Sequence, residues 1–134
     1  MVDTNVVVSA ALRDREPEAV ILHIVATSGV EWLATPWILE EYRAVLRRPK
    51  FGLEATQLAE WDRLLAAAVL VVEPGPKPPW AGDPGDVELV ACALATSADY
   101  LITGDRGLLG AGRLGTTLVV TVSQFKRSVC DRAG

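Results

Sequence analysis

The sequence predicts an α/β domain built on a parallel β-sheet. Short apolar segments rich in β-branched residues alternate with longer segments whose apolar residues recur with the 3.6-residue period of a helix. This alternation is typical of strand–helix–strand units, in which a helix connects two parallel strands. With 134 residues, of which 50% are hydrophobic and 22% are charged, the chain is long enough for one domain, residues 1–134, with an apolar core.

The pattern assigns five strands and six helices. The strands are expected at residues 1–3, 31–34, 69–72, 100–103 and 117–121, and the helices at residues 5–13, 17–28, 36–48, 54–68, 86–97 and 123–131. Pro17 and Pro36 suit the first turn of a helix, where a missing N–H costs no hydrogen bond, and Thr35 can cap the helix after it. Pro49 is expected to end the third helix. The proline-rich residues 73–85 predict a surface loop that leads into Asp86.

The overall composition excludes several classes of protein. No apolar run approaches the roughly 18 residues of a membrane span, and residues 1–5 lack the regions of a signal peptide, so we expect a cytoplasmic protein. Cys92 and Cys130 do not have the spacing of metal ligands, and we expect packed thiols rather than a disulfide. The net charge of −4 argues against nucleic-acid binding unless a cation neutralises a concentrated group of acids.

Two acidic residues directly follow expected strands. Asp3 follows a stub of two apolar residues, and Asp105 follows the segment Tyr-Leu-Ile-Thr-Gly. In a parallel α/β sheet, ligands bind at the carboxyl ends of the strands, so both residues are candidates for one site. Each of them could instead cap the helix that follows, because aspartate is a favoured N-cap.

Two further acidic residues lie on the inner side of expected helices. At about 100° per residue, Glu41 falls at the edge of the apolar stripe of its helix, whereas Glu40 lies nearly opposite and faces water. Asp86 lies near the centre of an apolar helix face, where a carboxylate is costly unless it is paired, capping or bound to a cation. A solvated Glu41 and a capping Asp86 behind the turn at Asp83 remain alternatives.

The four acids together predict a cation site. Two carboxylates about 4 Å apart repel by on the order of 4 kcal/mol near a protein surface, so four in one pocket require a divalent cation or raised pKa values. Ligation by carboxylate oxygens suits Mg²⁺ or Mn²⁺ rather than zinc. Such an ion can activate a water without a histidine base, and the only histidine, His23, lies on the polar side of its expected helix.

Four short motifs, in this order, resemble the PIN-domain family, in particular single-domain bacterial proteins that are the toxins of toxin–antitoxin pairs. The motifs are residues 2–6 (VDTNV), residues 39–42 (LEEY) with 45–51 (VLRRPKF), residues 83–86 (DPGD) with 91–93 (ACA), and residues 98–105 (ADYLITGD). Each motif is short, but the four in register extend over most of the chain.

The resemblance implies a three-layer α/β/α fold with a five-stranded parallel sheet of order 3-2-1-4-5, and a metal-dependent ribonuclease with Mg²⁺ or Mn²⁺. The implied catalytic and metal-binding acids are Asp3, Glu41, Asp86 and Asp105. Thr4, Asn5 and Thr103 match positions that support the carboxylates by hydrogen bonds. The implied partners are an RNA substrate, a cognate antitoxin and a second copy of the chain.

One feature departs from the family pattern, because only Met1 and Val2 precede Asp3. Either the start site is misassigned, or the first strand is short and leaves its neighbours under-paired. Arg48 and Arg106 are candidates for contacts with substrate phosphates, with solvated surface positions as the alternative.

Two other functions compete with the nuclease. An aspartate-nucleophile phosphatase would need a second aspartate at position 5, which is Asn5. A catalytically idle module that only binds RNA or a protein partner is the second alternative, and cleavage assays distinguish it.

Overall fold

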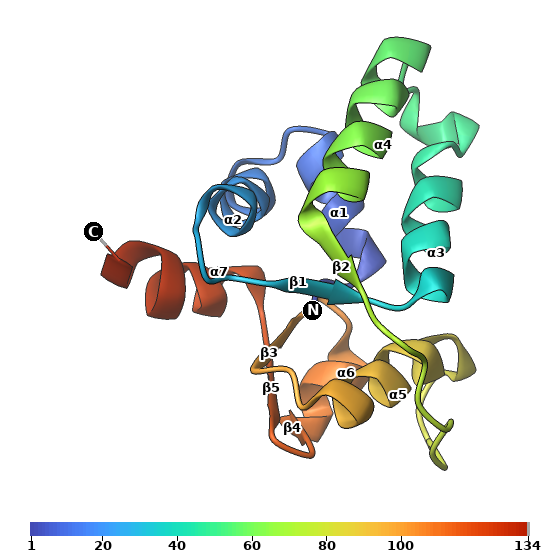
Figure 1. The fold of residues 1–134 in the computed structure, drawn as a ribbon, viewed down its shortest axis with the longest axis vertical. Helices are drawn as coiled ribbons and strands as arrows, with labels where there is room; N and C mark the ends of the chain where they lie inside the picture. Colours follow the sequence, from blue (N-terminus) through green and yellow to red (C-terminus); the bar gives the residue numbers. More distant parts are fainter. Residues whose placement is uncertain (134) are drawn as a thin grey trace.

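The computed structural model describes residues 1–133, which form helices around two small β-sheets (Figure 1). One sheet pairs β1 (Trp32–Ala34) in parallel with β2 (Val69–Val71). In the other, β5 (Thr117–Val120) lies between β3 (Tyr100–Ile102), which is parallel to it, and β4 (Arg113–Leu114), which is antiparallel. The expected α/β class is confirmed.

Each of the six expected helices overlaps an observed one. The helices are α1 (Thr4–Ala11), α2 (Arg15–Ala26), α3 (Pro36–Leu46), α4 (Ala55–Ala68), α5 (Val87–Thr96), α6 (Arg106–Ala111) and α7 (Val122–Phe125), with 3-10 turns at Pro49–Phe51 and Pro84–Asp86. Helix α6 was not expected, and the expected helix at residues 123–131 continues after α7 as a π-helical segment, Lys126–Cys130. None of these helices is long and apolar enough to cross a membrane within residues 1–133.

The expectation of one five-stranded parallel sheet was wrong. Val2 makes a single parallel bridge with Ile102, in which the Asp3 amide donates to the Ile102 carbonyl and the Ile102 amide donates to the Met1 carbonyl, both at 2.9 Å. No backbone hydrogen bond joins residues 1–3 to β1 within the described chain. If the expected strands are counted along the chain, their pairing still follows the order 3-2-1-4-5, except that the first strand, residues 1–3, is not paired with the second, β1. The first strand is so short that it pairs on only one side, with β3.

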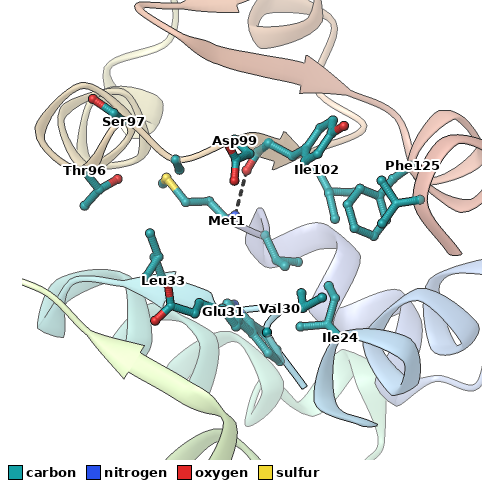
Figure 2. A pocket seen from close by; sticks show the side chains of 16 residues that line it. Met1, Ile24, Val30, Glu31, Leu33, Thr96, Ser97, Asp99, Ile102 and Phe125 are labelled. Atoms are coloured by element: carbon teal, nitrogen blue, oxygen red, sulfur yellow. Dashed lines mark hydrogen bonds between the residues drawn. The ribbon is translucent and has the colours of Figure 1, made fainter. Parts of the chain in front are cut away.

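A cavity of about 290 Å³ lies between the two sheets (Figure 2). Leu33 of β1 and Ile102 of β3 line it on opposite sides. The Met1 amine donates a hydrogen bond to the Tyr100 carbonyl at 2.7 Å. Ile24 of α2 and Phe125 of α7 also line it. The cavity therefore lies where the pairing expected between β1 and the first strand, residues 1–3, is missing.

Tyr42 of α3 joins the chain start to β1. Its ring is fully buried, and its centroid lies 5.7 Å from that of Trp32 in β1. The Tyr42 hydroxyl donates to the Val2 carbonyl and accepts from the Trp32 indole N–H at 3.2 Å. This contact takes the place of strand pairing on the free side of Val2 and fixes the residue directly before Asp3.

Replacing Tyr42 with phenylalanine should lower the free energy of unfolding by about 2 kcal/mol, because two buried polar groups, the Val2 carbonyl and the Trp32 N–H, lose their partner. Urea denaturation followed by tryptophan fluorescence measures the change. Tyr100→Phe, which removes a hydroxyl from a half-buried ring, is the control and should shift stability by less than about 0.5 kcal/mol. Equal losses in both variants would contradict a special role for the Tyr42 hydroxyl.

Candidate active site

The four acidic side chains come from four separate segments. Asp3 directly precedes α1, Asp105 directly precedes α6 after β3, and Asp86 ends the 3-10 turn that leads into α5. Glu41 lies in the middle of α3. Their charges act on one another: Glu41 and Asp105 on Asp3, and Asp105 and Asp3 on Asp86. The fold thus brings Asp3, Asp86 and Asp105 within range of one another's charges near the carboxyl ends of the first strand and β3, with Glu41 in range of Asp3.

Asp3 is the most buried of these residues, with 7% of its surface exposed. The Thr103 hydroxyl donates to its Oδ2 at 2.7 Å. Burial raises the pKa of the Asp3 carboxyl, and the negative charges of Glu41 and Asp105 add to the rise, whereas the hydrogen bond from Thr103 opposes it. The side chain makes no capping hydrogen bond with α1, so helix capping does not explain an aspartate here.

Glu41 is oriented by a hydroxyl from α1. The Thr4 hydroxyl donates to Glu41 Oε1 at 2.5 Å, and the glutamate is half-buried. Its neighbour Glu40 is exposed and lies 3.5 Å from Arg43, the next basic residue on the same helix. The two adjacent glutamates therefore have different environments, one facing the acidic group and one facing solvent.

The Asp86 carboxyl lies close enough to that of Asp105 for the two groups to interact. Burial raises the pKa of Asp86 to about 7, with further contributions from its interaction with the Asp105 carboxyl and from the charges of Asp3 and Asp83. Asp105 also caps α6, since its Oδ2 accepts from the Leu108 amide at 3.2 Å. Asp86 makes no such capping bond with α5. Capping accounts for part of the role of Asp105 but not for Asp86.

The residues fit a hard divalent cation by their chemistry. Carboxyl groups close enough to raise the pKa of Asp86 offer the negative charge and the oxygen donors that a divalent ion can use. Within residues 1–133, no three acidic, histidine or cysteine side chains converge closely enough to ligate one ion by themselves. Mg²⁺ commonly binds through one or two carboxylates and completes its shell with water and substrate phosphates, so the acidic group can serve it.

The other candidate residues lie at the ends of helices and in turns. Asn5 is exposed on the first turn of α1. Arg106, the first residue of α6, and Arg48, directly before the Pro49–Phe51 turn, are both exposed and can meet a ligand in solution. Asp83 supports the turn before Asp86, because its Oδ1 accepts from the Gly85 amide at 2.9 Å.

The proline-rich segment 73–83 has no regular secondary structure. Lys77 anchors it to α5 through an ion pair with Glu88 at 3.0 Å. Trp80 is half-buried against the hydrophobic core rather than displayed on the surface, and its indole N–H is buried without a partner among the described residues. The segment thus leads to Asp86 as a packed loop.

Comparison with known proteins identifies the family. The family model described as PIN domain matches residues 1–107, a range that contains Asp3, Glu41, Asp86 and Asp105. No curated protein and no solved structure matches the chain. Since the match extends over 107 of the 134 residues, the chain belongs to the PIN-domain family.

Proposed function

We propose that this protein is a metal-dependent endoribonuclease that uses Mg²⁺ or Mn²⁺. PIN domains are typically nucleases that require a divalent metal ion. The observation that carries the proposal is that the Thr103 hydroxyl bonds both the buried Asp3 carboxylate and the Asp105 amide, with the Asp86 carboxyl close enough for their charges to raise its pKa. The raised pKa values of Asp3 and Asp86 mean that their charged forms destabilise the folded protein. A cation that neutralises these carboxylates removes that cost, and a functional metal site explains why the acids lie together.

The proposed roles follow from the environments of the acids. Asp3 and Asp105 hold the ion directly or through water, while Glu41 and Asp86 orient the attacking water or hold a second ion. A divalent ion bound there supplies an acidified water and offsets negative charge on the phosphoryl oxygens. Because the pKa of Asp86 is about 7, its carboxyl can take up or release a proton near neutral pH.

The hydroxyls of Thr103 and Thr4 act as positioning groups. Thr103 donates to Asp3 and also accepts from the Asp105 amide at 3.0 Å, so one hydroxyl sets the relation between two acids. Thr4 fixes one oxygen of Glu41. The exposed Arg48 and Arg106 are proposed to contact substrate phosphates through their planar donor groups.

The proposal extends to the cell biology of the protein. We assign it the role of the toxin in a cytoplasmic toxin–antitoxin pair, held inactive by its antitoxin and active as a homodimer. Exposed apolar side chains of α2, Leu22 and Val25, support a protein contact on this helix. Light scattering of the purified chain, alone and with its antitoxin, tests both assemblies.

A catalytically idle RNA- or partner-binding module is the second candidate. One observation favours it: no three ligands converge on a single ion position among residues 1–133. The two candidates differ in one result. A binding module retains RNA intact in the presence of Mn²⁺, whereas the nuclease shortens it.

Substitution of any one of the four acids should reduce RNA cleavage by at least about 100-fold, because each carboxylate neutralises or orients a reacting group. The variants are Asp3→Asn, Glu41→Gln, Asp86→Asn and Asp105→Asn. Cleavage of a labelled mixed-sequence oligoribonucleotide with Mn²⁺ measures the effect, and EDTA should abolish cleavage by the parent protein.

Glu40→Gln is the matched control, since it makes the same chemical change one residue away on the exposed face of α3. It should cut RNA at the parent rate within about twofold. If Glu41→Gln were as active as Glu40→Gln, Glu41 would have no part in the site.

Without metal, stability should fall as pH rises from about 4 to 7. The pKa of Asp86 in the folded protein is about 7, above the 3.8 of a free aspartate, so the folded state binds the proton more tightly and loses that stabilisation as the carboxyl ionises. Thermal melts in EDTA measure this slope.

The change of stability with pH should be smaller in Asp86→Asn than in the parent. At pH 8, Mn²⁺ should restore the stability of the parent but not that of Asp86→Asn. Asp14→Asn, at an exposed carboxylate that makes no capping hydrogen bond, is the control and should keep the parent's slope. An unchanged slope in Asp86→Asn would show that another group titrates.

A further inference from the structure

A second hollow, of about 270 Å³, lies directly beside the acidic group. Its lining comes from α1, the start of α2, the residues directly after β3 and the start of α7 with its N-cap: Asn5, Val6, Ser9, Pro17, Thr103, Gly104, Thr121, Val122 and Ser123. Thr103 belongs to both places, because it is among the residues that line the hollow and its hydroxyl donates to Asp3. A ligand in the hollow therefore adjoins the carboxylates.

The hollow differs from the acidic group in its chemistry. None of its nine lining residues carries a charge. On its rim, Ser123 donates to the exposed, acidic Glu16 at 2.9 Å. The lining itself offers no cation to a phosphate, whereas a neutral ligand meets no buried charge there. The hollow thus suits the uncharged part of a nucleotide.

The lining offers both apolar surface and hydrogen bonds. Val6 and Pro17 are buried and present apolar atoms, against which a base or sugar can pack. None of the side-chain hydrogen bonds described for residues 1–133 involves Asn5 or Ser9, and both line the hollow. The amide of Asn5 and the hydroxyl of Ser9 can therefore serve a ligand.

We propose that this hollow binds the sugar and base of one nucleotide that flanks the scissile phosphate of a single-stranded RNA. This inference rests on the proposed nuclease function. It adds the direction in which the bound RNA extends from the acidic group, which is toward the hollow. A volume near 270 Å³ is at the lower end of small-molecule sites and matches one nucleoside rather than several. Asn5 and Ser9 are the specificity-determining residues.

The test combines a substitution that fills the hollow, Ser9→Phe, with RNA substrates that lack one base. The parent protein's cut in an oligoribonucleotide is first mapped, and substrates are then made with an abasic ribose on either side of that bond. In the parent, removal of one of the two bases should lower kcat/KM on the order of tenfold. In Ser9→Phe, whose ring occupies the hollow, kcat/KM for the intact RNA should already be reduced by this factor, and the same base removal should have no further effect.

Asn5→Ala at an exposed position supplies a second variant that does not depend on core packing, and it should raise KM with little change in kcat. Ser28→Phe, at an exposed serine beyond the opposite end of α2 from Pro17, is the matched control and should keep the full effect of base removal. Base removal that is equally harmful in the parent and in Ser9→Phe would overturn the subsite while leaving the nuclease intact. A parent that cuts no RNA would overturn the proposed function and this inference with it.

Discussion

The site depends on the burial of the Asp3 carboxylate beside other acids. A carboxylate with 7% of its surface exposed is costly, and the charges of Glu41 and Asp105 increase the cost. The fold offsets part of it with the hydroxyl of Thr103. The remainder is relieved when Asp3 takes up a proton, which its raised pKa favours, or when a cation neutralises the acids.

Several features could be predicted from the sequence because local physics determines them. The helical period predicted that Glu41 faces inward and Glu40 faces solvent. In the structure, Glu41 accepts a hydrogen bond from Thr4, and Glu40 is exposed. Because parallel strands end at the same edge of a sheet, the positions of Asp3 and Asp105 after two strands predicted that the two acids lie near each other. In the structure, the charge of Asp105 acts on Asp3. Capping was an open alternative for these acids, and it applies to Asp105 but not to Asp3 or Asp86.

Other features could not be predicted because they depend on packing between distant segments. The break in the sheet agrees with the short first strand that the sequence offered as one alternative, but the hydrogen bond from Tyr42 to the Val2 carbonyl, which takes the place of pairing there, joins residues 40 apart in the chain. Helix α6 is so short that no period can reveal it, although Asp105 before Leu108 is a capping pattern. The hollow beside the acids is built from four separate segments, so the sequence held no sign that Ser9 lines it with Thr121.

The central claim is that a divalent cation takes the place of the proton that Asp86 holds near neutral pH beside Asp105, and direct measurement of Mn²⁺ binding tests it without any substrate. Calorimetry at pH 6.5 in buffers of different ionisation enthalpy gives both the affinity and the protons released. Our account predicts that Mn²⁺ binds the parent with release of about one proton, and that Asp86→Asn loses the proton release while Glu40→Gln keeps it. Absence of Mn²⁺ binding by the folded parent, or binding that is unchanged when Asp86 and Asp105 are both replaced by asparagine, would contradict it.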